Sequence, residues 1–192
     1  MIKNKYQNKL LFLSIIMISG ILCGSIMNKI LNIQIFDVNL LEKIINYDEF
    51  TYEYFTLLFT NNLILYLIIL LCSTSFLGLI LISFIHFIKG LMIGYNIMLM
   101  LVLYQIKGIL GIMIILVPFY LLEVISIMII SCSGISLSMK WINLILKQKR
   151  IKFKLWYSKM LNEFIISIII LIIHCMIQVF VMIDVCKWFY FL

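Results

Sequence analysis

One carboxylate stands inside the longest apolar stretch of this chain. Glu123 is the only residue with a charged side chain between Gly108 and Ser138. A carboxylate near the middle of a bilayer costs roughly 2.5–3.5 kcal/mol, so such a residue normally faces a polar cavity or a partner group. On a helix, Ser126 lies one turn after Glu123 and shares its face. We therefore predict that both side chains point into the interior of a helical bundle.

Other residues that could have a chemical or structural role lie before and after this carboxylate. Pro118 is the only proline of the chain, and proline removes one backbone hydrogen bond from a helix. It predicts a break, with a short re-entrant or interfacial piece over about 108–117 and a full span over about 118–138. Gly134 reduces the side-chain bulk near the end of that span. His174 and Gln178 are four residues apart on one face of the last span, where they could meet Glu123 or make an ordinary interhelical hydrogen bond.

The composition decides the class of protein that must position these residues. The chain has 192 residues, of which 65% are hydrophobic and 12% charged, and its mean hydropathy is +1.20. A soluble domain carries about 25% charged residues, so this chain is predicted to be an all-α, polytopic integral membrane protein. We expect a single membrane domain over residues 1–192 with about five spans. The predicted spans are about 10–27, 63–84, 87–104, 109–138 and 164–183.

Small and polar residues mark the ends and contacts of these spans. Asn62 stands just before the second predicted span, where its side chain could cap the helix. His86 and Lys89 interrupt the apolar pattern and predict a short loop, with the histidine on the surface. Gly90 and Gly94 open the third span, and the first span holds a second pair of glycines at the same spacing. Such pairs let a neighbouring membrane helix approach closely.

The loops indicate the topology. Residues 28–60 mix acidic and apolar residues, which is typical of interfacial amphipathic helices or of a solvated connector. Residues 140–160 are rich in lysine and contain Trp141 and Trp156, which favours a cytoplasmic loop beside anionic lipid and disfavours nucleic-acid binding. The positive-inside rule then predicts a cytoplasmic N-terminus and an extracytoplasmic C-terminus in the cell membrane.

No pattern of catalytic or metal-binding residues is visible in the sequence. The five cysteines lie singly, without paired cysteine or histidine spacing, so neither a metal site, a cofactor site nor a disulfide framework is predicted. The sequence has no HExxH, no GxSxG and no paired aspartates. We therefore expect a protein that is not an enzyme. The sequence leaves self-association into a homo-oligomer open.

Several of these motifs, taken in order, resemble the stage II sporulation protein M family. They are Phe59-Thr60-Asn61-Asn62 before the second span, Lys89-Gly90-xxx-Gly94 at the third, and Pro118, Glu123 and Gly134 in the fourth. Two positions depart from the family pattern. Lys89 stands where the family typically has asparagine, and Phe119-Tyr120 replaces a His-Gly pair.

The resemblance implies a role in engulfment of the forespore by the mother-cell membrane. A family member would be a membrane scaffold that recruits the membrane-anchored cell-wall hydrolases of sporulation, proteins D and P, without catalysing a reaction itself. In that case the 28–60 loop would face the wall space. The alternative from the residues themselves is a transporter or channel-like component, since an intramembrane carboxylate beside a broken helix is what an ion-coupled site needs.

Overall fold

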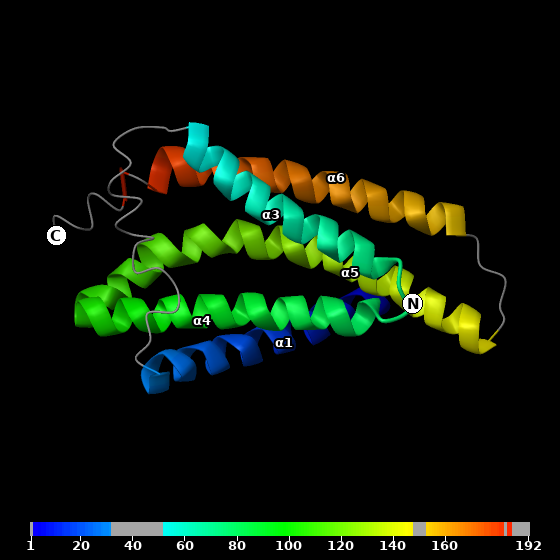
Figure 1. The fold of residues 1–192 in the computed structure, drawn as a ribbon, viewed down its shortest axis with the longest axis horizontal. Helices are drawn as coiled ribbons and strands as arrows, with labels where there is room; N and C mark the ends of the chain where they lie inside the picture. The colour runs from blue at the N-terminus through cyan, green and yellow to red at the C-terminus, as the bar shows by residue number, and fades with distance from the viewer. Residues whose placement is uncertain (1, 32–51, 148–152, 183, 186–192) are drawn as a thin grey trace.

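The computed structural model of the chain describes residues 2–31, 52–147, 153–182 and 184–185. This part is a bundle of long helices, as predicted. The elements are α1 (Ile2–Leu31), α3 (Tyr52–Ser73), α4 (Gly78–Gly111), the π-helical η1 (Ile112–Leu116), α5 (Val117–Lys147), α6 (Phe153–Ile177) and the π-helical η2 (Gln178–Met182). In Figure 1, α5 runs between a layer made by α1 and α4 and a layer made by α3 and α6.

Four helical segments in the described ranges are long and apolar enough to cross a membrane, where the sequence predicted about five spans. The difference lies in the third segment, Gly78–Leu146, whose 69 residues cover both α4 and α5. A straight helix of that length would measure about 100 Å, against a hydrocarbon core of about 30 Å. The segment instead folds back on itself, so α4 and α5 form the two arms of a hairpin, and the described residues give four separate apolar helical segments and not five.

The fold-back point is Gln105, which has φ 49° and ψ −121° inside α4. Among the described residues it is the only non-glycine residue with a positive φ. Beyond it, Gly108 approaches the backbone of Met100 and Leu101 so closely that a Cβ would not fit. The chain therefore turns back at Gln105, between the predicted spans 87–104 and 109–138. The two arms then pack antiparallel, as Figure 1 shows for α4 and α5.

The predicted break before Pro118 is a π-helical segment inside continuous helix. Residues 106–111 remain helical, and η1 continues them as a five-residue π-helix. The backbone N–H of Val117 donates to the carbonyl of Ile112, five residues back, which is the bonding of a π-turn. Pro118 follows η1 directly. Because proline has no backbone N–H to donate to the preceding turn, a local departure from α-helical hydrogen bonding is expected there.

The boundary between the second and third spans was predicted in the wrong place. The helix break falls at residues 74–77, and His86 and Lys89 lie inside α4. Hydroxyl side chains bond the backbone at this break: Ser73 Oγ donates to the Leu70 carbonyl at 2.6 Å, and Thr74 Oγ1 donates to the Leu71 carbonyl at 2.7 Å. Such local bonds compete with continuation of the helix. The predicted surface histidine is accordingly buried, with 1% of its area exposed.

The helices extend into both predicted loops. Helix α1 continues to Leu31 and α3 begins at Tyr52, so both ends of the predicted 28–60 loop are helical, and residues 32–51 lie outside the described part. Helices α5 and α6 likewise extend into the predicted basic loop and leave 148–152 outside the description. Asn62 is not a helix cap, since it lies ten residues into α3 and its side chain donates to the Leu58 carbonyl at 3.2 Å.

Candidate functional site

The centre of the bundle holds an ion pair between α4 and α5. Lys89 Nζ donates to Glu123 Oε1. Only 5% of the glutamate side chain and 18% of the lysine side chain are exposed. The prediction that Glu123 faces inward is confirmed, and its partner is the residue that the sequence analysis had assigned to a loop. Each charge offsets the large cost of burying the other away from water.

Hydrogen bonds link this pair to the two helices on the other side of α5. Ser126 is fully buried, and its hydroxyl shares a hydrogen bond with the hydroxyl of Tyr66 on α3. The same hydroxyl donates to the Glu123 carbonyl at 2.8 Å. Ser167 Oγ of α6 donates to the Ser126 carbonyl at 3.1 Å. One turn of α5 is thus bonded to α3, α4 and α6 together.

The predicted pair on the last span is also in the interior. His174 and Gln178 have 1% and 3% of their areas exposed, respectively, and His174 Nε2 lies 2.9 Å from Gln178 Nε2. The ring of Phe119 meets the His174 ring edge to face, with centroids 6.1 Å apart. His174 is close enough to interact electrostatically with both Glu123 and Lys89. The structure therefore brings this histidine beside the ion pair without a direct hydrogen bond to it.

The glycines of α1 and α4 form a seam where two backbones meet. A Cβ on Gly90 would strike the carbonyl oxygen of Met17, and one on Gly94 would strike that of Ile21. Reciprocally, Gly20 and Gly24 lie against the backbone of α4. The order of these contacts shows that α1 and α4 are parallel, as they are in Figure 1. Parallel helices joined by small residues at this spacing are a common membrane contact.

Gly134 lies at the junction of three helices. A Cβ at this position would come 2.9 Å from Ile82 Cδ1 on α4 and 3.2 Å from Ser73 Cβ on α3. Nearby, Ser138 Oγ accepts a hydrogen bond from the Leu79 backbone N–H at 3.1 Å. Gly134 therefore fixes how closely α5 approaches the turn between α3 and α4. Of the predicted site residues, Asn62 and Pro118 are not among these interior contacts.

A second cluster of polar side chains lies nearer the N-terminal end of α1, and it was not predicted from the sequence. Glu163 of α6 accepts a hydrogen bond from Ser133 of α5 and pairs with Lys159 at 3.5 Å, one helical turn away. Lys9 of α1 donates to Ser136 of α5. The regular serines of α5 were a signal for this contact, since serine is a frequent interhelical hydrogen-bonding residue in membranes.

Three buried polar atoms in the described part have no hydrogen-bond partner: His86 Nε2, Ser131 Oγ and Gln178 Oε1. Buried polar atoms are normally satisfied by protein or by water, so these three atoms are exceptions in the described part. Across the same described residues there is no group of three or more histidine, cysteine, aspartate or glutamate side chains that could hold a metal ion.

Comparison with known proteins gives one match. Residues 9–182 match the family model described as SpoIIM, Stage II sporulation protein M. No curated protein and no solved structure matches the chain. The match covers nearly all of the helices described above, including the ion pair, the glycine seam and the hairpin of α4 and α5.

Proposed function

The chain belongs to the stage II sporulation protein M family, and on that basis we propose that it is a membrane scaffold of the engulfment machinery. In this role it anchors the peptidoglycan-degrading stage II sporulation proteins D and P at the engulfing membrane. It does not itself catalyse a reaction. Sporulation and a multi-pass membrane character follow from the family and the apolar helices, whereas the scaffold role and its partners are the proposal.

The observation that carries the proposal is that the Glu123 carboxylate is neutralised by a lysine of the same chain. A residue that binds a transported ion must present its carboxylate to a pathway, but Glu123 is 5% exposed and paired with Lys89. Together with Ser126 it bonds one turn of α5 to three neighbouring helices. Such an arrangement serves to hold a bundle in one shape, which is what a scaffold requires.

Charge supports the orientation that a scaffold of this kind needs. The start of α1, the lysine-containing end of α5 and the lysine-containing start of α6 lie at the same end of the bundle in Figure 1. Positive residues favour the cytoplasmic side, so we propose a cytoplasmic N-terminus and an extracytoplasmic C-terminus. Residues 32–51 join α1 to α3 at the opposite end and would then face the wall space, where D and P work.

The test is co-purification of tagged protein from sporulating cells, with quantitation of proteins D and P. Replacing residues 33–50 by a neutral linker of equal length leaves α1 and α3 intact and is expected to abolish recovery of both. A matched replacement of residues 187–192 should keep it. Absence of D and P from the wild-type sample would refute the scaffold role.

A second candidate, an ion- or proton-coupled transport component, is favoured by the orphaned Gln178 Oε1 beside His174. The double variant Lys89→Gln/Glu123→Gln separates the two candidates. It removes both charges together, so a scaffold should still recover D and P, whereas a coupled carrier should lose function. Loss of sporulation with recovery of D and P unchanged would favour transport.

A further inference from the structure

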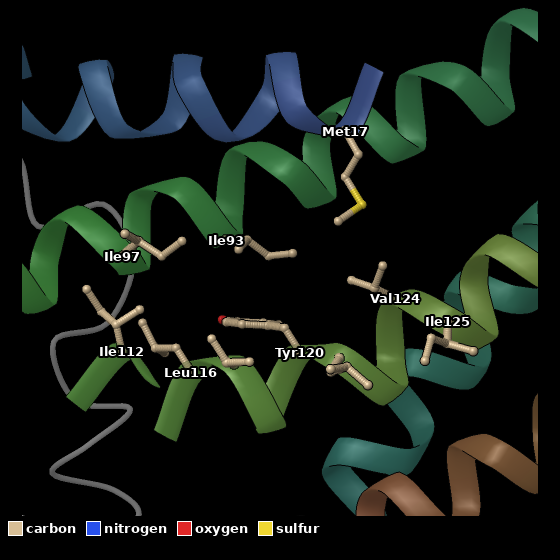
Figure 2. A pocket seen from close by; sticks show the side chains of 10 residues that line it. Met17, Ile93, Ile97, Ile112, Leu116, Tyr120, Val124 and Ile125 are labelled. Atoms are coloured by element: carbon tan, nitrogen blue, oxygen red, sulfur yellow. The ribbon is translucent and has the colours of Figure 1, made fainter. Parts of the chain in front are cut away.

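An apolar groove follows the seam where α1, α4 and α5 meet. Its volume is about 310 Å³. Figure 2 shows Ile93 and Ile97 of α4 on one side and the residues of η1 and α5 on the other, with Met17 of α1 at one end. The lining begins at Ile112 and ends at Ile125 along the hairpin's second arm.

The lining offers nothing polar to a guest. The one hydroxyl in it belongs to Tyr120, and that oxygen accepts a hydrogen bond from Asn96 Nδ2 at 2.5 Å. On the outer side of the groove Leu121 and Ile125 are 49% and 44% exposed. In a chain that spans the membrane these side chains meet lipid. The groove therefore opens sideways to hydrocarbon and not to water.

The dimensions of the groove favour one occupant. The thirteen-residue advance from Ile112 to Ile125 corresponds to about 20 Å along a helix. A helix with its side chains is about 10 Å across and would occupy about 1,600 Å³ over that length, several times the volume of the groove, which is about 310 Å³. An apolar cavity of about 150 Å³ holds one benzene ring, so a groove of this length and volume suits a single extended hydrocarbon chain.

We propose that this groove binds one acyl chain of a membrane lipid, lying along the α4–α5 hairpin. The walls are preformed, because the glycine seam fixes α1 on α4, and the Lys89–Glu123 pair fixes α4 on α5. A preformed apolar slot loses little entropy on binding a chain. The site is independent of the sporulation role, so either can fail without the other.

The experiment uses the full-length protein in nanodiscs of phosphatidylethanolamine and phosphatidylglycerol. A small fraction of the phosphatidylglycerol carries a photoactivatable diazirine along one acyl chain, and adducts are located by mass spectrometry. We expect at least fivefold more adduct per residue at Ile93 and Ile97 than at Val102 and Leu103. The latter two lie on the same helix and are 58% and 49% exposed.

Variants separate a specific site from general lipid contact. Ile97→Trp fills the groove and should lower groove adducts at least fivefold, while Val102→Trp, on the exposed face, should leave them unchanged. Ile97→Phe repeats the test with a smaller side chain if the tryptophan variant loses its helical circular dichroism. Equal adducts inside and outside the groove would overturn the proposal. Adducts confined to the exposed residues, with none in the groove, would also overturn it, because the groove would then be filled by protein and not by lipid.

Discussion

Removal of one member of the Lys89–Glu123 pair should destabilise the bundle far more than removal of both. Lys89→Leu leaves Glu123 buried at 5% exposure with no opposite charge beside it. Breaking a buried pair in this way costs about 3–5 kcal/mol. Glu123→Leu leaves the lysine, which is 18% exposed and has a long apolar stem that can carry its charge toward the interface. We expect this variant to lose only about 2–3 kcal/mol.

The double variant Lys89→Leu/Glu123→Leu should be within about 1 kcal/mol of the wild type or more stable, because packed leucines have no desolvation cost. The four proteins form a double-mutant cycle with a coupling free energy of at least about 3 kcal/mol. That coupling is more than a hundredfold in the ratio of folded to unfolded protein, since every 1.4 kcal/mol is about tenfold.

The assay is equilibrium unfolding in mixed micelles with increasing sodium dodecyl sulfate, followed by far-ultraviolet circular dichroism. Lys159→Leu is the control. Lys159 pairs with Glu163 one helical turn away, and 57% of the lysine side chain is exposed. Exposed pairs contribute little to stability. Additive single effects, with the double variant as unstable as their sum, would refute the reasoning. A control variant as damaging as Lys89→Leu would refute it too.

Three further predictions follow from the same contacts and can be measured in the same unfolding assay. Gly24→Ile should lower the free energy of unfolding by about 3 kcal/mol, because its side chain would meet the backbone of α4. The control Cys23→Leu, on the exposed side of α1, should be near neutral. A Gly24→Ile variant as stable as the wild type would contradict the close contact at the glycine seam. Tyr66→Phe should cost about 0.6–1 kcal/mol through its lost hydrogen bond to Ser126, and no further loss should follow when Ser126→Ala is added. Gln105→Gly should raise stability by about 1 kcal/mol, because glycine adopts φ 49° without strain; a lower stability would show that the Gln105 side chain holds the turn.

The inward face of the fourth predicted span could be found from the sequence, because the free-energy cost of exposing Glu123 to lipid dominates there. A lone carboxylate in an apolar run has few places to go, and Ser126 follows at helical spacing. The glycine pairs were also visible, since Gly90 and Gly94 matched a pair in the first span. That the two pairs would meet each other could not be derived, because small-residue spacing does not identify the partner helix.

The sequence did not indicate the partner of Glu123, because a polar residue inside an apolar run fits a loop as well as a buried ion pair. His86 and Lys89 interrupt the apolar pattern and therefore predicted a loop. The break instead falls at serine and threonine: Ser73 and Thr74 donate to carbonyls of the preceding turn, and Ser75 Oγ accepts the backbone N–H of Leu77. Hydropathy counts these residues as mild, although their hydroxyls are well placed to end a helix. Moving the break by about ten residues transfers Lys89 from a loop to the depth of Glu123.

The position of the ion pair also explains why the hairpin needs it. In lipid, apolar side chains gain little by leaving one hydrocarbon environment for another, so packing and polar contacts must hold helices together. Helix α1 meets α4 through the glycine seam, where backbones touch. Beside the apolar groove α4 and α5 stand further apart, and there Lys89 and Asn96 reach across to Glu123 and Tyr120. Long polar side chains thus span the separation that the groove requires, and removal of either charged partner alone should open the groove as well as weaken the bundle.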